Sequence, residues 1–482
     1  MLLLEQFSYK ANTNERCRSK LTALAAAYST KGHDVKALVN DMLSALKHRG
    51  SNDFILAYSN EHPQLGVGYA SNNPRKGFFE SKLATVALDG VFFKKNQRGR
   101  AQMALHESLG RFNSIMKTAG AFAEVSMRSN TLSAVRDPIG LRPLYYSKKS
   151  DVTAIASERK ALWRIGHTRT ERILPGHLYT VKSRGLTKKR LFRFPHLHAQ
   201  HMTMNYAAAR LKRILQQSIR LITSDVDRVA VAFSGGLDSA ITALLAKQAN
   251  LEVELISTGL EGSSELQTVE KYAKALDLPI TIETYDADSL DYFIRRVLWL
   301  IEEPDLMKVS IAIPLHWASM LAARRGHSVM LCGQGSDELY GGYYKYAKIL
   351  DNEGNRALVS ALYRSIVEAP QVNYERDEQA TCPSGVELRT PFANLDVIDF
   401  SFQIPLDFKV KTGNDLVRKW VLREAARKAG LSEDIVWRRK KAIQHGTGVE
   451  NAIRKLAKTQ RITTDGYLSN ISVAVSSLEA MP

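Results

Sequence analysis

The chain has 482 residues, and 67 Lys and Arg against 49 Asp and Glu give a formal net charge of +18. This length predicts two or three domains, and 44% apolar with 24% charged residues excludes a wholly disordered, collagenous or coiled-coil chain. Three cysteines without a C-x-x-C pair favour a reducing, cytoplasmic setting. No uncharged run is long enough to span a membrane, and the apolar start MLLL is too short for a secretory signal, so we expect no membrane segment.

Residues 1–183 form the first predicted domain, in which short strand-like runs alternate with turns rich in Gly, Pro, Asn and Asp. This pattern favours a strand-rich layer, with helical patterns at 34–48 and 98–117. Residues 184–203 are basic, contain Pro and show no period, so we predict a linker there. His196, His198 and His201 lie in that linker without a nearby Cys or carboxylate, and we expect no metal site.

Residues 204–482 form the second predicted domain. An apolar stripe over 207–222 predicts an amphipathic helix. After it, nearly continuous apolar strands alternate with helices. The strands are predicted at 228–233, 252–258, 279–285 and 327–333. Such alternation indicates a doubly wound parallel sheet covered on both faces.

The strongest local signal is the run Ser234-Gly235-Gly236-Leu237-Asp238-Ser239, placed where a predicted strand meets a helix. Glycines there let the backbone approach a phosphate, and the free N–H groups at the start of the helix favour an anion. Asp238 would repel a phosphate unless Mg²⁺ lies between them. No G-K-[ST] follows, so the run predicts a cradle for magnesium pyrophosphate rather than a Walker loop.

This run resembles the pyrophosphate loop of the ATP-pyrophosphatases, and the wider pattern is similar to the asparagine synthetase family. Residues 251–276, LCGQGSDELYGGY (331–343), GVELRTPF (385–392) and WRRKK (437–441) carry the likeness in the second domain. In the first domain, segments at 46–53, 88–90, 134–147, 156–162 and 174–177 are similar to the family's class II glutamine amidotransferase domain. The resemblance implies an α/β protein. Its amino half would be an Ntn-type αββα sandwich, and its carboxyl half an ATP-pyrophosphatase sheet with helical additions.

The resemblance also implies a reaction and its residues. A substrate carboxylate attacks the α-phosphorus of ATP, and ammonia then displaces AMP; ATP and Mg²⁺ are the implied cofactors. Metal ligands would be Asp238 and Asp337, and Lys440 would stabilise the transition state at phosphorus. Catalytic roles are also expected for Glu387, Glu338 and Gln334, although an ion pair with Arg389 is an equal alternative for Glu387. The ATP-binding residues would be Ser234, Gly235, Gly236, Asp238, Ser239, Leu255, Ser257, Cys332 and Gly333.

The amino half departs from the family pattern at the positions that glutamine hydrolysis needs. The family nucleophile is a cysteine at the mature amino terminus; here position 2 is Leu, and Cys17 is the only candidate. Asp89 stands where the family has an oxyanion-binding Asn, and its charge would repel an oxyanion. The segments at 65–71 and 106–112 lack the family's glutamine contacts. We therefore expect this domain to keep the fold without hydrolysing glutamine.

The part of the second domain that would bind the carboxylate substrate also departs from the family pattern. Gln334 replaces an acidic residue of the family and cannot act as a base, so Glu338 or Glu387 would have to substitute. The family's aspartate contacts are replaced by Met307 and Ser310, while Lys308 could still neutralise a substrate carboxylate.

These features predict an AMP-forming amide ligase that acts on aspartate or a related carboxylate with ammonia, glutamine being the less favoured donor. A β-lactam-forming variant, an RNA-modifying ATP-pyrophosphatase and a non-catalytic nucleotide-binding protein stay open as alternatives. The charge of +18 would suit RNA, but solvated surface charges give the same total, so a nucleic-acid partner is not favoured. A homodimer is compatible with the sequence. Residues 459–482 have no counterpart in the family pattern.

Overall fold

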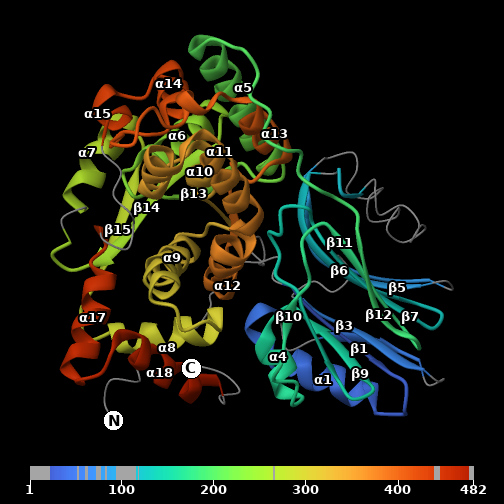
Figure 1. Cartoon of the computed structure of the whole chain (residues 1–482). Helices are drawn as coiled ribbons and strands as arrows, with labels where there is room; N and C mark the ends of the chain where they lie inside the picture. The colour runs from blue at the N-terminus through green and yellow to red at the C-terminus, as the bar shows by residue number, and fades with distance from the viewer. Residues whose placement is uncertain are drawn as a thin grey trace.

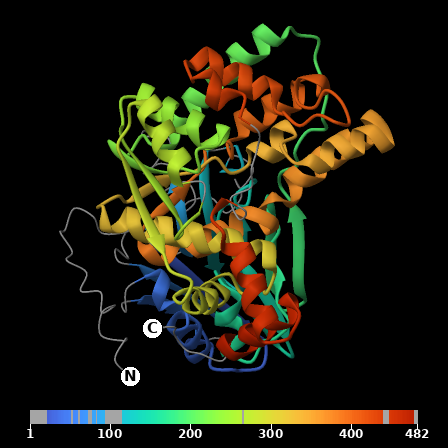
Figure 2. The same cartoon turned by 90° about the vertical axis from the view of Figure 1, so that its left-hand side faces the viewer.

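The computed structural model describes residues 22–50, 54–59, 63–71, 77–81, 84–93, 115–117, 119–263, 266–438 and 446–476. Two halves pack side by side, the amino half built on two sheets and the carboxyl half on a third sheet surrounded by helices (Figure 1). The view turned by 90° shows helices α17 and α18, near the carboxyl end, lying across the lower part of the molecule (Figure 2). Their bounds are Val449–Thr459 and Thr464–Ser476.

The amino half is a sandwich of two six-stranded sheets. The first has the order β10-β8-β9-β1-β3-β2. Its strands are Glu171–Arg172, Tyr145–Lys149, Val152–Ala156, Thr22–Ser29, Gln64–Ser71 and Phe54–Tyr58. The second has the order β12-β11-β7-β6-β5-β4. Its strands are Gly185–Arg190, His177–Lys182, Thr131–Arg136, Gly120–Arg128, Thr85–Phe92 and Phe78–Glu80.

Strand β1 shows how the sequence builds these layers. Its side chains alternate between two faces because successive residues of a strand point in opposite directions. Leu24, Ala26 and Tyr28 enter the core between the sheets, whereas the small side chains between them face outward, under helices α1 (Val35–Ser44) and α4 (Arg159–Arg164). The predicted αββα sandwich is confirmed on this side. On the far side most of the predicted helix at 98–117 lies outside the described residues.

The amino-half sheet extends into the segment predicted as linker. Strand β12 pairs with β11 in antiparallel fashion, from His177 opposite Arg190 to Lys182 opposite Gly185. It is an edge strand, and edge strands often carry exposed charges that prevent pairing with other molecules. Because Lys188, Lys189 and Arg190 are exposed in this way, the strand has the composition of a linker. The connection between the halves therefore begins only after Arg190.

The carboxyl half contains a five-stranded parallel sheet with the order β15-β14-β13-β16-β17. Its strands are Ile280–Tyr285, Glu252–Leu260, Arg228–Ala232, Val329–Leu331 and Glu387–Arg389. Val229, Val231 and Leu255 pack against helix α6 (Leu237–Gln248) on one face, and Ala230 and Ile256 pack against helix α9 (Leu306–Arg324) on the other. The sheet is covered on both faces, as predicted.

Further helices surround this sheet and complete the carboxyl half. They are α5 (Met204–Ile222), α7 (Leu266–Leu276), α8 (Leu290–Ile301), α10 (Ser336–Tyr340), α11 (Tyr344–Ala369), α12 (Glu375–Thr381), α13 (Leu395–Gln403), α14 (Trp420–Ala429) and α15 (Glu433–Val436). Among the described residues, α9 alone is long and apolar enough to cross a membrane, and 67% of its most apolar window is buried inside the protein. That burial is typical of a core helix.

Candidate active site

The Ser234–Ser239 loop joins the carboxyl end of β13 to the start of α6, as predicted. Gly235 adopts a positive φ of 66°, which glycine tolerates without strain. The two serines shape the turn, since the Ser234 amide donates to Ser239 Oγ at 3.3 Å and the Gly236 amide donates to Ser234 Oγ at 3.4 Å. Gly236 is the N-cap of α6. The unpaired N–H groups of the helix start therefore lie at this loop, where they favour a phosphate.

The loop that follows β16 lies directly against this turn. A Cβ on Gly333 would stand 2.6 Å from Asp238 Cβ and 3.1 Å from the Ser239 amide nitrogen, so only glycine permits this approach. The contact brings Cys332, Gly333 and Gln334 to the edge of the Ser234–Ser239 loop, the phosphate loop. Cys332 is buried, and burial raises the pKa of its thiol to about 12, so the thiol stays neutral.

Asp238 and Asp337 meet at one buried ammonium group. Lys419 Nζ lies 2.7 Å from Asp238 Oδ2, 2.6 Å from Asp337 Oδ1 and 2.7 Å from Ser336 Oγ. Burial lowers the pKa of Lys419, but the two carboxylates outweigh it, so the pKa is raised and the side chain stays charged. A Cβ on Gly342 would overlap both Asp337 and Lys419, so glycine there makes room for the group.

These two carboxylates fit a magnesium ion. They are hard oxygen donors, the ligand type that Mg²⁺ prefers, and they already hold a positive charge beside the phosphate loop. Lys419 was missed at the sequence level. It comes far later in the chain than the acidic motifs, and its own neighbourhood carries no pattern that points to them.

A cavity of about 450 Å³ adjoins the phosphate loop. Ser234 and Ser257 line it together with apolar side chains, including Phe233, Val269 and Leu315, which suits the flat apolar faces of a nucleotide base. The side chain of Leu255 is buried in the core below the sheet. Only backbone atoms of Leu255 are therefore left for a ligand, and its predicted part in ATP binding stays a prediction.

The basic segment 437–441 reaches the loop through Arg438. Its Nη1 donates to the carbonyl oxygen of Gly235 at 2.7 Å, and its guanidinium lies 5.3 Å from the centre of the Tyr272 ring. Lys440 lies outside the described residues.

The structure separates the other candidate catalytic residues. Glu338 is buried and accepts hydrogen bonds from Tyr343 Oη at 2.6 Å and Asn373 Nδ2 at 2.7 Å. Glu387 pairs with Arg389 at 2.7 Å and Arg142 at 3.2 Å, so the structural ion pair, left open by the sequence, is formed.

Lys308, predicted to neutralise a substrate carboxylate, is bound by other protein groups. Its ammonium pairs with Glu303 and donates to the carbonyl oxygen of Gln371 at 2.7 Å. It lines neither the cavity beside the phosphate loop nor the one between the halves. The predicted role in holding a substrate carboxylate therefore has no geometric support, because a neighbouring glutamate already neutralises the lysine.

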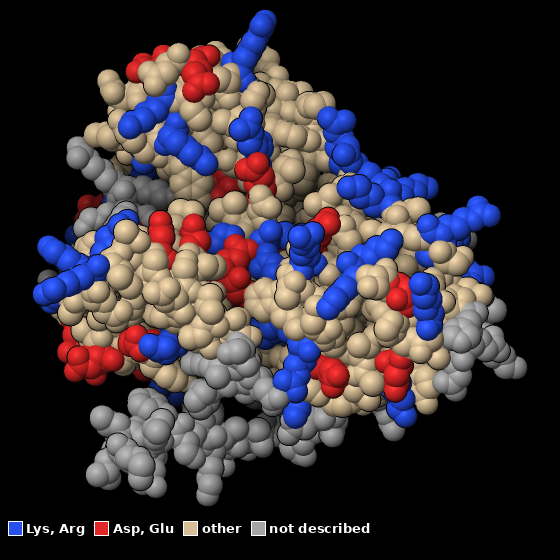
Figure 3. Space-filling model, turned by 60° about the horizontal axis from the view of Figure 1, so that its bottom comes forward, with Lys and Arg blue, Asp and Glu red and all other residues tan. Residues whose placement is uncertain are grey.

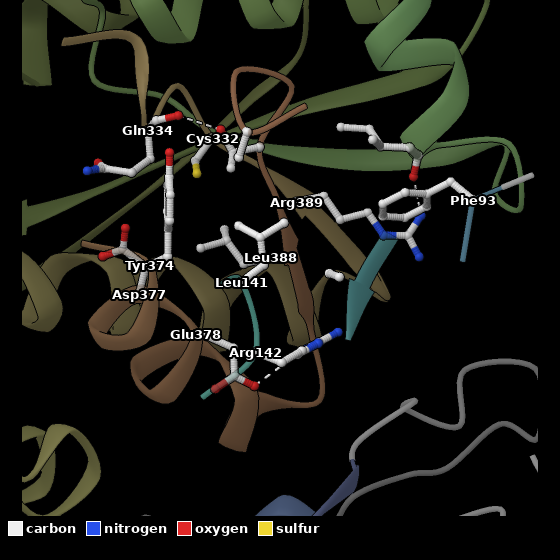
Figure 4. A pocket seen from close by; sticks show the side chains of 14 residues that line it. Phe93, Leu141, Arg142, Cys332, Gln334, Tyr374, Asp377, Glu378, Leu388 and Arg389 are labelled. Atoms are coloured by element: carbon white, nitrogen blue, oxygen red, sulfur yellow. Dashed lines mark hydrogen bonds and ion pairs between the residues drawn. The ribbon is translucent and has the colours of Figure 1, made fainter. Parts of the chain in front are cut away.

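A second cavity, of about 530 Å³, lies between the two halves and ends at the phosphate side of the sheet (Figure 4). Gln334, Tyr374 and Asp377 stand together at one end, and Arg142 and Glu378 stand at the other (Figure 4). The amino half contributes Phe93, Ala121, Leu141 and Arg142 to the lining. An acceptor or an amine that reaches the phosphate loop from this side meets both halves.

In the amino half, Arg49 is fully engaged by protein groups. Its five N–H groups donate to Thr22 O at 3.2 Å, Glu158 Oε1 at 2.9 Å, Asp89 Oδ2 at 3.4 Å and both oxygens of Glu378, at 2.5 and 2.9 Å. A guanidinium has five N–H donors, so none is left for a ligand carboxylate. The Glu378 carboxylate comes from α12 in the carboxyl half.

Asp89 lies in the same buried cluster. Its Oδ1 accepts a hydrogen bond from Thr22 Oγ1. Burial raises the pKa of Asp89, although Arg142 and Arg49 oppose the shift. The Asp89 side chain presents carboxylate oxygens, and not an amide N–H, to the groups around it in this cluster. Cys17 and the segment 106–112 lie outside the described residues.

The structure joins a loop suited to a phosphate, and the nearby carboxylates of Asp238 and Asp337, to an αββα sandwich, the combination expected of an ATP-dependent carbon–nitrogen ligase. The asparagine synthase family model matches residues 210–369 and 350–472, and the glutamine amidotransferase domain model matches 86–195. The chain is 32% identical over 385 residues to a Methanocaldococcus jannaschii protein named among the glutamine-hydrolyzing asparagine synthetases, covering 70% of each chain. The chain belongs to the asparagine synthetase family.

Other relatives give the same family. The glutamine-hydrolyzing asparagine synthetase 2 of Arabidopsis thaliana is 27% identical over 484 residues, covering 91% of this chain and 80% of the relative. Among solved structures, the glutamine phosphoribosylpyrophosphate amidotransferase of B. subtilis, complexed with ADP and GMP, overlaps with a TM-score of 0.31 at 14% identity. That overlap covers 54% of this chain and 65% of the other.

Proposed function

We propose that this ligase activates aspartate or a closely related carboxylate with ATP and couples it to free ammonia, without hydrolysing glutamine. The observation that carries the proposal is a contrast between the halves. The cavity beside the phosphate loop leaves room for a nucleotide, and Lys419 bridges the two carboxylates there, whereas Glu378 occupies Arg49 in the amino half.

The activation step requires charge on the phosphates to be neutralised while the substrate carboxylate approaches. Amides at the start of α6 would hold the pyrophosphate part of ATP, and Arg438 keeps the loop in shape through Gly235. Asp238 and Asp337 would hold Mg²⁺, which supplies charge neutralisation when bound. Lys440 would add a positive charge at the α-phosphorus.

Loss of glutamine hydrolysis follows from the amino-half pocket. A ligand carboxylate that bound Arg49 would have to displace Glu378, and the buried Glu378 would then keep Arg142 as its remaining basic partner, a rearrangement of buried charges that costs free energy. Asp89 would in addition repel the oxyanion that forms during amide hydrolysis. The amino half then serves as a wall of the cavity between the halves.

The test is a product assay with purified protein, ATP, Mg²⁺ and a panel of carboxylic acids. With aspartate and ammonia we expect AMP, pyrophosphate and asparagine in equal amounts. Replacing ammonia by glutamine should give neither asparagine nor glutamate. Stoichiometric glutamate release would overturn the proposed loss of the glutaminase, and AMP formed from an amino acid without added ammonia would indicate ring closure by the substrate's own amine. Failure of every acid to give pyrophosphate would overturn the ligase proposal for these substrates.

Nucleic acid is not part of this proposal. On the face shown in Figure 3, Lys and Arg are interspersed with Asp and Glu rather than gathered in one groove. Much of the positive charge in the interior is also neutralised, since the buried arginines Arg49, Arg136 and Arg389 all pair with carboxylates.

A further inference from the structure

The second step of the proposed reaction needs a group that takes a proton. When ammonia attacks the acyl carbon of an adenylate, its nitrogen becomes positively charged and must lose a proton to yield an amide. Gln334, at the edge of the phosphate loop, has no basic group. The cavity between the halves therefore has to be searched for another acceptor.

Three carboxylates near this cavity are already neutralised or fixed. Glu378 binds Arg49 through both oxygens and Arg142 at 3.2 Å. Glu387 pairs with Arg389 and Arg142. Glu338 is fixed by Tyr343 and Asn373 and does not line the cavity.

Asp377 differs from these three. It lies on α12, lines the cavity and is buried, with only 3% of its surface exposed. Arg376, the preceding residue, contacts Oδ1 alone, through Nε at 2.8 Å and Nη2 at 2.6 Å. Among the residues that the structure describes, no hydrogen-bond donor reaches Oδ2. One oxygen of a buried carboxylate is thus available at the cavity wall.

The position of Asp377 also suits the task. It stands with Tyr374 and Gln334 at the end of the cavity that adjoins the phosphate loop (Figure 4). Its charge acts on the thiol of Cys332, in the loop that follows β16, where it contributes to the raised pKa after burial itself. Burial raises the pKa of Asp377 as well, although Arg376 opposes the shift, and a carboxylate of raised pKa is a better proton acceptor at neutral pH.

We propose that Oδ2 of Asp377 accepts the proton from the amine that attacks the acyl-adenylate. The nitrogen lone pair forms the C–N bond, and the C–O bond to the phosphate of AMP breaks, with its electron pair leaving on AMP. The proton of the charged nitrogen moves to Asp377 Oδ2 and from there to water. This assignment rests on the proposed ligase function, because it concerns the second half of the same reaction.

The experiment separates the two half-reactions in the variant Asp377→Asn. The substitution keeps the shape and an oxygen for Arg376, which retains the carbonyl oxygen of Val372 at 3.2 Å. Exchange of pyrophosphate into ATP, driven by the carboxylate substrate, reports adenylation and should stay within about twofold of the unchanged protein. Amide formation with ammonia should fall at least about a hundredfold, the usual range for a lost general base.

The rate of hydroxamate formation with hydroxylamine in place of ammonia distinguishes a role of Asp377 in proton transfer from a structural role. Hydroxylamine is a far weaker base than ammonia, so its nitrogen loses the proton without help, and hydroxamate formation should be much less impaired in Asp377→Asn. The matched control is Glu368→Gln, an exposed carboxylate on the preceding helix, which should leave all three rates unchanged.

Each outcome bears on a separate claim. Amide formation by Asp377→Asn within about threefold of the unchanged protein, or an equal loss with ammonia and hydroxylamine, would overturn the assignment of Asp377. Absence of pyrophosphate exchange in the unchanged protein would instead overturn the ligase function on which it rests.

Discussion

Lys419 shows at the scale of one residue how the carboxylates of Asp238 and Asp337 are held together. Its ammonium lies within 2.8 Å of oxygens of both Asp238 and Asp337, so it neutralises two carboxylates that would otherwise repel each other. We expect Lys419→Met to lower the free energy of unfolding by on the order of 3 kcal/mol without metal, the range for a broken buried ion pair. Mg²⁺ should restore part of that loss, because the ion can take the place of the ammonium.

Urea denaturation with and without Mg²⁺, in the absence of nucleotide, measures this effect. Lys455→Met, which removes an exposed lysine on α17, serves as the matched control and should change stability by less than about 0.5 kcal/mol. Equal stability of Lys419→Met in both buffers would contradict the view that ammonium and metal share one position.

Two helices meet through a buried histidine, and this contact predicts a pH dependence at the scale of elements. His316 Nδ1 on α9 donates to the carbonyl oxygen of Ala380 on α12 at 2.7 Å, and burial lowers the pKa of His316 to about 4. An unfolded histidine has a pKa of about 6.5. Between pH 6.5 and 4 the unfolded chain therefore binds the extra proton. The contribution of the neutral, buried His316 to the free energy of unfolding is complete above pH 6.5. It is lost as the pH falls to 4, and the loss amounts to roughly 3 kcal/mol.

The variant His316→Gln isolates this contribution, since its amide can still donate to Ala380. The free energy of unfolding, measured from pH 7 to pH 4, should fall less steeply in the variant. The difference in slope should correspond to the uptake of up to one proton fewer on unfolding. His48 is buried with a pKa also lowered to about 4 and contributes equally to both proteins, so the difference belongs to His316. Replacing the exposed His201 by Gln should not change the slope, and parallel curves for His316→Gln would refute the prediction.

For the whole molecule, the sequence predicted well the features that depend on neighbouring residues in the chain. It predicted poorly the contacts that form only when distant segments pack together. The phosphate loop and the parallel sheet follow from strand and helix patterns around residues 228–239, and each lies where expected. Lys419 and Asp377 were missed because their partners are brought to them only by tertiary packing. Strand β12 was missed for the opposite reason: its exposed charges give it the composition of a linker, although its backbone completes a sheet.

The two halves are joined by a buried layer of ion pairs, in which the amino half supplies basic groups and the carboxyl half supplies acidic ones. Glu375 on α12 is its centre, since it accepts from Arg136 at 2.9 Å, Tyr145 Oη at 2.9 Å and Arg172 at 2.7 Å. Burial opposes its ionisation, but Arg136 and Arg172 outweigh burial and hold the pKa of Glu375 below its usual value. The layer therefore places α12, and with it Asp377 and Glu378, against the amino half.

Removing this charge by Glu375→Gln leaves the fully buried Arg136 without its anion, which should cost on the order of 3 kcal/mol. In scanning calorimetry we expect the transition to shift to lower temperature and amide formation to fall more than pyrophosphate exchange, because α12 lines the acceptor side while the phosphate loop is built elsewhere. Glu171→Gln, a replacement of an exposed carboxylate in the amino half that accepts from Tyr146 Oη, is the control and should change neither. An unshifted transition in Glu375→Gln would mean that packing of apolar surfaces, not this ion-pair layer, holds the halves together.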